Sequence, residues 1–248
     1  MERRDFLKLG TIGAVGLGLT ALDSLWHIQQ AQAAELPRRF PQLGEPEQGS
    51  GSPTISESLS PDAALQKLMQ GNQRFAQNLP QHPYQSPARL KAVAQAQHPF
   101  ATILSCADSR VPAEIIFDRG IGDIFDVRIA GNIATPEAIG SIEYAVALLD
   151  TPLLLVLGHE RCGAVTAAVK NEELLGDIST FVKAILPAVK RVKDEPGDAV
   201  ENAVIANVHY QIEHLKRSAI LTERLLSGKL KIIGGRYDLD TGRVNIIT

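Results

Sequence analysis

Short apolar runs alternate with amphipathic segments along the middle of the chain. The runs FATILS (100–105), IFDVRIA (124–130) and LLLVLG (153–158) are each bounded by turn residues. Continuous apolar strands are typical of a parallel sheet that is covered on both faces. Residues 136–149, between two of these runs, carry apolar side chains at helical spacing. The alternation therefore predicts an α/β fold, a mainly parallel β-sheet flanked by helices.

Capping residues mark where several helices begin. Ser60, Ser86 and Thr135 each precede a proline, so a hydroxyl can cap the helix while proline takes its first position. Two further helices and a C-terminal strand hairpin are predicted over 179–192, 199–226 and 229–247.

The N-terminal region differs from the rest of the chain in its pattern of charged, apolar and small residues. Arg3 and Arg4 precede the apolar run Leu9–Leu22, which resembles a twin-arginine export signal, and Ala31–Ala33 has the small-x-small pattern of a cleavage site. The run is shorter than the about 20 residues that span a bilayer, which disfavours an uncleaved anchor helix. We therefore predict an export signal over 1–33, a periplasmic or other extracytoplasmic location, and no stable membrane span after cleavage.

The remaining chain divides into a leader and one domain. Residues 34–59 are rich in Pro, Gly, Ser and Glu, which predicts a flexible leader. Residues 60–248 are long enough for one domain with a sizeable core. The chain is 44% hydrophobic and 21% charged, with a net charge of -3. This balance lacks the basic excess of nucleic-acid-binding proteins, so we expect no nucleic-acid partner.

The two cysteines of the chain both lie at predicted strand ends. Cys106 directly follows the strand over 100–105, whereas His159 directly follows the strand over 153–158, with Cys162 three residues further on. In open parallel sheets ligands bind at the carboxyl ends of the strands, so these side chains are expected at one edge. Two thiolates and an imidazole suit zinc, and three protein ligands leave a fourth position for water. A disulfide between the cysteines is the alternative in an oxidising compartment.

Asp108 and Arg110 follow the first cysteine closely and leave several interpretations open. The carboxylate of Asp108 could bind the metal and block the fourth position. It could instead form a bidentate pair with Arg110, remain ionised and orient a zinc-bound hydroxide. A surface salt bridge of little energetic weight is the third interpretation.

The order C-x-D-x-R followed by H-x-x-C resembles the β-class carbonic anhydrases. The surrounding segments SCADSRVPAEIIFDRGIGDIFDVRIAGNIATPEAIGSIEYAV and LVLGHERCGAV are similar to the family's core, and the resemblance runs from about Ala63 to the C-terminus. It implies zinc ligation by Cys106, His159 and Cys162, a catalytic dyad of Asp108 and Arg110, and substrate binding by Gln97 and Gly163. In the family the aspartate of this dyad can also ligate zinc, in a closed, inactive form.

The resemblance implies the activity as well. It predicts a zinc-dependent lyase, a carbonate dehydratase with one Zn²⁺ per subunit, in which zinc-bound hydroxide attacks CO2 to give bicarbonate and a proton. A related hydrolase of CS2 or carbonyl sulfide and a non-catalytic zinc-binding protein are the alternatives. The family's active site lies at a dimer interface, so the implied partner is a second copy, in a homodimer or an assembly of dimers.

One position departs from part of the family. Some members carry a tryptophan three residues before the first cysteine, in a non-catalytic bicarbonate pocket that switches the enzyme off. This chain has Ile103 there, although Arg128 of that pocket is retained. We therefore do not expect this mode of regulation.

Overall fold

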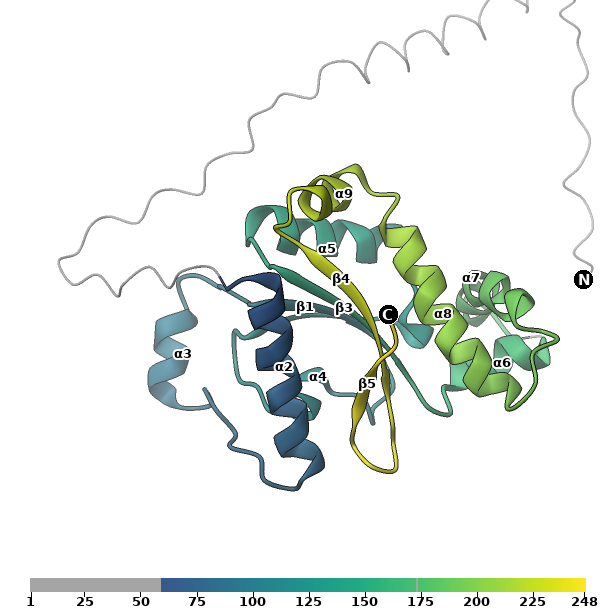
Figure 1. Cartoon of the computed structure of the whole chain (residues 1–248), viewed down its shortest axis with the longest axis horizontal. Coiled ribbons are helices and arrows are strands. Elements are labelled where there is room, and N and C mark those ends of the chain that lie inside the picture. The colour runs from purple at the N-terminus through teal and green to yellow at the C-terminus, as the bar shows by residue number, and fades with distance from the viewer. Residues whose placement is uncertain (1–58, 173) are drawn as a thin grey trace, which may run out of the picture. The chain divides into compact units, whose positions relative to one another are not determined.

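The apolar runs form the centre of one five-stranded sheet. The computed structural model describes residues 59–172 and 174–248, and its strands lie side by side in the order β2-β1-β3-β4-β5 (Figure 1). The strands are β1 (Ala101–Ser105), β2 (Ile124–Arg128), β3 (Leu153–His159), β4 (Lys231–Tyr237) and β5 (Val244–Ile246). The first four are parallel, and β5 returns antiparallel to β4. This confirms the mainly parallel sheet with a C-terminal hairpin. The predicted signal over 1–33 and nearly all of the predicted leader over 34–59 lie outside the described residues.

Helices connect the strands and cover both faces of the sheet (Figure 1). They are α2 (Pro61–Ala76), α3 (Pro87–Val93), α4 (Ala113–Ile116), the 3-10 turn η1 (Ala130–Asn132), α5 (Pro136–Leu148), α6 (Gly163–Lys170), α7 (Ile178–Arg191), α8 (Ala199–Leu215) and α9 (Ala219–Leu226). The predicted caps are confirmed, because the hydroxyls of Ser60, Ser86 and Thr135 each accept a backbone N–H from three residues further on. Within the described residues, no helix combines the length and apolar character needed to cross a membrane.

Two of the predicted element boundaries were wrong. The single helix predicted over 199–226 is two helices, because Ser218 takes an extended conformation and its hydroxyl accepts the N–H of Leu221, which starts α9. The strand predicted over 124–130 ends at Arg128, because Gly131 takes a positive φ of 72° and turns the chain into η1. Both breaks are local changes of backbone conformation. The apolar spacing of the sequence continues through each of them.

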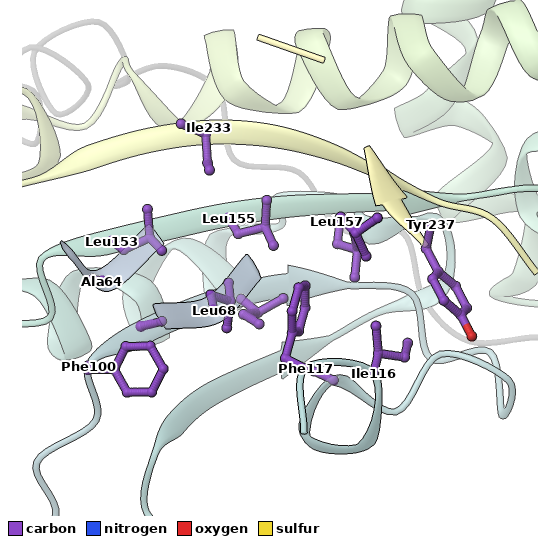
Figure 2. Close-up of a cluster of buried hydrophobic side chains, with 14 of the residues drawn as sticks. Ala64, Leu68, Phe100, Ile116, Phe117, Leu153, Leu155, Leu157, Ile233 and Tyr237 are labelled. Carbon is purple, nitrogen blue, oxygen red and sulfur yellow. The ribbon is translucent and has the colours of Figure 1, made fainter. Parts of the chain in front are cut away.

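Alternate residues of β3 build the cores on the two faces of the sheet. Leu153, Leu155 and Leu157 point to the face covered by α2 and α4, where they pack around Leu68 and Phe117 (Figure 2). The next positions along β3 point to the opposite face, against α5 and α8. Every residue of β3 is buried, as expected for a central parallel strand. The sheet is therefore covered by packed apolar side chains on both faces.

A third apolar cluster lies beyond the carboxyl ends of β1 and β3. It includes both cysteines together with residues of α6, α7 and α8, of which Val165, Ile185 and Val204 are almost fully buried. The edge that the sequence predicts as a ligand site is thus a buried apolar environment rather than an open surface.

Candidate metal centre

Three side chains from distant segments converge at the carboxyl edge of the sheet. Cys106 follows β1 directly, His159 is the last residue of β3, and Cys162 is the residue that precedes α6. One ligand atom from each lies within 4.8 Å of the other two, and all three residues are buried. Strands β1 and β3 are direct neighbours in the sheet, which is why their ends meet. The convergence predicted from the sequence is confirmed.

The imidazole of His159 is oriented for metal binding. Its Nδ1 lies 2.8 Å from the backbone carbonyl oxygen of Glu160, which can only accept, so Nδ1 carries the proton and donates. Its Nε2 is buried, and no hydrogen-bond partner for it exists among the described residues. A buried polar atom without a partner is costly, and here its lone pair faces two sulfurs. Two thiols and a free imidazole nitrogen fit a zinc ion with one open position.

The two cysteines are free thiols, and their sulfurs lie within 4.8 Å of one another. The neighbouring Cys162 side chain lowers the pKa of Cys106, assisted by His159 and by the backbone N–H of Gly131 at 3.2 Å from that sulfur. The same interaction with Cys106, together with burial, raises the pKa of Cys162. The environment therefore already stabilises one thiolate. The arrangement argues against the disulfide alternative.

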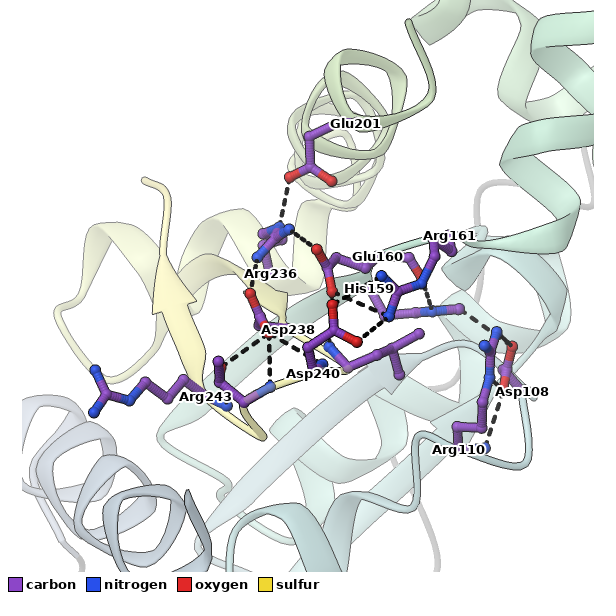
Figure 3. Close-up of polar contacts among 12 residues, drawn as sticks. Asp108, Arg110, His159, Glu160, Arg161, Glu201, Arg236, Asp238, Asp240 and Arg243 are labelled. Carbon is purple, nitrogen blue, oxygen red and sulfur yellow. Dashed lines mark hydrogen bonds and ion pairs between the residues drawn. The ribbon is translucent and has the colours of Figure 1, made fainter. Parts of the chain in front are cut away.

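Asp108 and Arg110 form the bidentate pair that was one of the open interpretations. Oδ1 of Asp108 accepts from Nε of Arg110 at 2.9 Å, and Oδ2 accepts from Nη2 at 2.7 Å (Figure 3). These hydrogen bonds hold the pKa of the Asp108 carboxyl well below its usual range. Oδ2 also lies 3.8 Å from Nε2 of His159, at the border of the ligand cluster. The carboxylate is thus ionised, fixed by Arg110 and adjacent to the centre.

Arg128 holds the loop that carries this dyad. Its Nη2 donates to the backbone carbonyl of Asp108 at 2.7 Å, and its Nε donates to that of Cys106 at 3.2 Å. Ile103, at the position of the family's tryptophan, is fully buried in the core against α2 and α4. In this chain Arg128 therefore stabilises the loop that begins at Cys106.

The two residues expected to bind substrate are placed differently. Gly163 is the first residue of α6, directly after Cys162, and open space surrounds the position where a Cβ would stand. Gln97 lies in the exposed segment between α3 and β1. In the described part of the chain, no hydrogen bond joins Gln97 to the ligand cluster. The fold therefore brings Gly163 to the site and leaves Gln97 on the surface of this protomer.

Sequence reasoning missed the backbone groups that support the ligands. The N–H of Gly131 and the carbonyl of Glu160 contact Cys106 and His159, respectively. Every residue type has the same backbone donor and acceptor, so the sequence does not mark these groups. The exception is the glycine at position 131, which could have suggested the positive φ that is found there.

Comparison with known proteins agrees with this geometry. A sequence profile described as carbonic anhydrase matches residues 101–244. Carbonic anhydrase 2 of Mycobacterium tuberculosis is 43% identical over 191 residues, which cover 75% of this chain and 92% of that protein. The carbonic anhydrase of Synechococcus elongatus is 33% identical over 195 residues, which cover 73% of this chain and 70% of that protein.

Solved structures give the same result. The β-carbonic anhydrase CcaA is similar with a TM-score of 0.60 and 28% identity, over 74% of this chain and 95% of that one. A Coccomyxa β-carbonic anhydrase in complex with acetazolamide has a TM-score of 0.59 and 25% identity, over 74% of this chain and 86% of that one. Two sulfurs and an imidazole converge in this chain, and the matches cover most of its length. The chain therefore belongs to the β class of the carbonic anhydrase family.

Proposed function

We propose that this protein is a zinc-dependent carbonate dehydratase that interconverts CO2 and bicarbonate. The observation that carries the proposal is the buried Nε2 of His159, which has no hydrogen-bond partner among the described residues and is bordered by Asp108. Ligand atoms of His159 and of both cysteines lie within 4.8 Å of one another. Cys106, His159 and Cys162 would hold the metal. Zinc, when bound, lowers the pKa of water and so supplies a nucleophile near neutral pH.

The dyad orients the reacting groups. Oδ1 of Asp108 accepts two hydrogen bonds from Arg110, one from the backbone N–H and one from Nε. Oδ2 accepts one hydrogen bond from Arg110, from Nη2. Oδ2 therefore keeps a lone pair toward the centre and can accept a hydrogen bond from the attacking group. An ionised acceptor cannot donate, so it selects the orientation in which a nucleophilic lone pair faces CO2. Asp108 acts as an orienting acceptor in this proposal, with Arg110 keeping it ionised.

Substrate binding and assembly complete the proposal. The backbone at Gly163 approaches the centre without a side chain in the way. Gln97 is exposed, which is compatible with a contribution to the site of a second copy in a homodimer or an assembly of dimers. The exposed apolar side chains Tyr144 and Leu148 on α5 support such packing. Two β-carbonic anhydrases of Sordaria macrospora, similar in fold with a TM-score of 0.62, are described as tetrameric.

We further propose that the protein is exported by a twin-arginine-type route to an extracytoplasmic compartment. The support is the Arg3-Arg4 pair, the apolar run after it and the small residues at Ala31 and Ala33. This route carries folded proteins, so the metal centre could be loaded while its thiols are still in a reducing compartment.

Stopped-flow CO2 hydration with parallel zinc analysis tests the activity. We expect about one zinc per chain and hydration that rises on the alkaline side, because two thiolates neutralise the ion and leave water with a higher pKa than in a three-histidine site. Assays with CS2 and carbonyl sulfide run beside it. Zinc-loaded protein that consumes these and not CO2, or none of the three, would overturn the proposal.

A further inference from the structure

Glu160 is held in place at several points directly beside the histidine ligand. Its backbone N–H donates to the carbonyl of Tyr237 at 3.0 Å, and its backbone carbonyl accepts Nδ1–H of His159. One carboxylate oxygen accepts from Nη2 of Arg236 at 2.7 Å, and the other accepts the N–H of Leu239 at 3.0 Å. The residue whose carbonyl fixes the imidazole is therefore itself fixed through its side chain by β4 and the loop after it.

Arg236 anchors this arrangement from β4. Its guanidinium contacts three carboxylates, those of Glu160 at 2.7 Å, Glu201 of α8 at 2.5 Å and Asp238 at 3.0 Å (Figure 3). Its side chain is 15% exposed and that of Glu160 is 17% exposed, so the pair is shielded far better than an ordinary surface salt bridge. Each contact comes from a different segment, so Arg236 connects α8 and β4 to the turn between His159 and Cys162.

The acidic side chains around Arg236 are already paired. Glu160, Asp238 and Asp240 lie close enough together to suggest a second cation site. Arg236 contacts the first two, and Arg161 forms a bidentate pair with Asp240 at 2.8 and 3.0 Å. Arginines thus compensate the negative charge of these carboxylates. The ion pairs of the cluster therefore hold neighbouring segments together.

We propose that the Glu160–Arg236 pair is a positioning unit for the metal centre, which sets the imidazole of His159 through the Glu160 carbonyl. The inference rests on the proposed zinc function. Groups that orient a ligating histidine through its second nitrogen change metal affinity by about 10- to 100-fold when they are removed. Neither side chain is among the groups that would hold the metal, so both act through His159.

The test compares two identical substitutions in the full-length protein. Glu160→Gln keeps the shape of the side chain, but its single carbonyl oxygen can satisfy only Arg236 or Leu239, and its NH2 faces the other donor. Glu213→Gln is the matched control, because Glu213 also forms a bidentate arginine pair, with Arg191 at 2.7 Å on both arms, on an exposed part of α8. Zinc affinity is measured by chelator competition, and the Co²⁺-loaded proteins are compared by their visible absorption.

We expect the zinc dissociation constant of Glu160→Gln to rise about 10-fold, the lower end of the range because the carbonyl is shifted and not removed, and its Co²⁺ spectrum to change, with Glu213→Gln within twofold of wild type. Arg236→Lys, which keeps the charge but cannot reach three carboxylates, is expected to weaken zinc binding likewise, and it decides the matter if Glu160→Gln does not fold. Affinities within twofold of wild type and an unchanged Co²⁺ spectrum would overturn the inference. A wild-type protein without zinc binding or CO2 hydration would instead count against the proposed function.

Discussion

The backbone N–H of Gly131 donates to the sulfur of Cys106 over 3.2 Å. This contact exists because Gly131 takes a φ of 72°, a conformation that glycine adopts without strain. Its own carbonyl accepts from the amide of the buried Asn207 on α8, at 2.9 Å. The turn after β2 is thus tied to Cys106, a candidate metal ligand, on one side and to α8 on the other.

Gly131→Ala should therefore weaken both the fold and the metal centre. A Cβ there would lie 2.6 Å from Cδ1 of Ile185, in a backbone region that disfavours side chains. We expect a loss of about 2 to 4 kcal/mol in the free energy of unfolding, measured by urea denaturation, and weaker zinc binding. Gly140→Ala is the control, because Gly140 lies in the middle of α5 with open space around it and should gain about 0.5 to 1 kcal/mol. Equal effects of the two substitutions would contradict the prediction.

Asp108→Asn should separate catalysis from metal binding. In the structure the carboxylate is paired with Arg110 and borders the ligand cluster, so its loss removes an orienting acceptor and no ligand. We expect CO2 hydration to fall by about 100-fold or more, with zinc content unchanged. Glu213→Gln, which weakens the exposed bidentate pair with Arg191, should leave hydration near wild type. A loss of zinc in Asp108→Asn would show that the aspartate is a ligand after all.

Asp126 should make the stability of the protein depend on pH. Burial, with a smaller contribution from the charge of Glu114, raises the pKa of Asp126 from 3.8 to about 6. The folded state thus binds the proton more tightly than the unfolded state, so this group's contribution is present below pH 4 and is lost as the pH rises to about 6. Two pKa units correspond to about 3 kcal/mol, an upper bound because Arg128 lies 4.0 Å away and can move closer.

Asp126→Asn should accordingly stabilise the protein at pH 7.5 by up to about 3 kcal/mol and leave its stability at pH 4 almost unchanged. Urea denaturation at both pH values measures this difference. Glu114→Gln should show the same trend more weakly, since it removes only the repelling charge. A destabilised Asp126→Asn protein at pH 7.5 would argue that the ion pair with Arg128 outweighs the burial.

Removal of zinc should destabilise the fold. Without the ion, Nε2 of His159 stays buried with no partner among the described residues, whereas a ligand that binds only the folded state at 1,000 times its dissociation constant adds about 4 kcal/mol. We expect chelation to lower the urea midpoint and added zinc to restore it. His159→Ala should lack the zinc-dependent part of this stability. A midpoint that does not respond to chelation would contradict the metal centre.

The export proposal has its own test. Replacing Arg3 and Arg4 together by lysine should abolish export while leaving hydration by the cytosolic protein intact, because these residues precede the folded domain. N-terminal sequencing of the exported wild-type protein should begin near Ala34 or Glu35. An exported protein that retains residues 1–33, or export of the lysine variant at the wild-type level, would refute the proposed signal.

Much of the site could be predicted because its ligands are tied to local patterns. The apolar runs identified β1 and β3, and the residue after each run lies at the edge of a parallel sheet, so the meeting of Cys106 with His159 follows from strand order. The helix boundary at Ser218 and the early end of β2 were not predicted, because the apolar spacing continues through both. At both places the backbone conformation ends the element. A helix cap at Ser218 starts a new helix, and the positive φ of Gly131 ends the strand.

The sequence by itself determined the class of fold and the three candidate ligand residues, since each depends on spacing along the chain. Only the tertiary structure decided that Asp108 binds Arg110 at the border of the cluster, that Gly131 and Glu160 support the ligands through backbone atoms, and that Gln97 lies apart on the surface. The physical reason is that hydrogen bonds to backbone groups and contacts between distant segments depend on where the chain folds back. The identity of a residue does not encode that position.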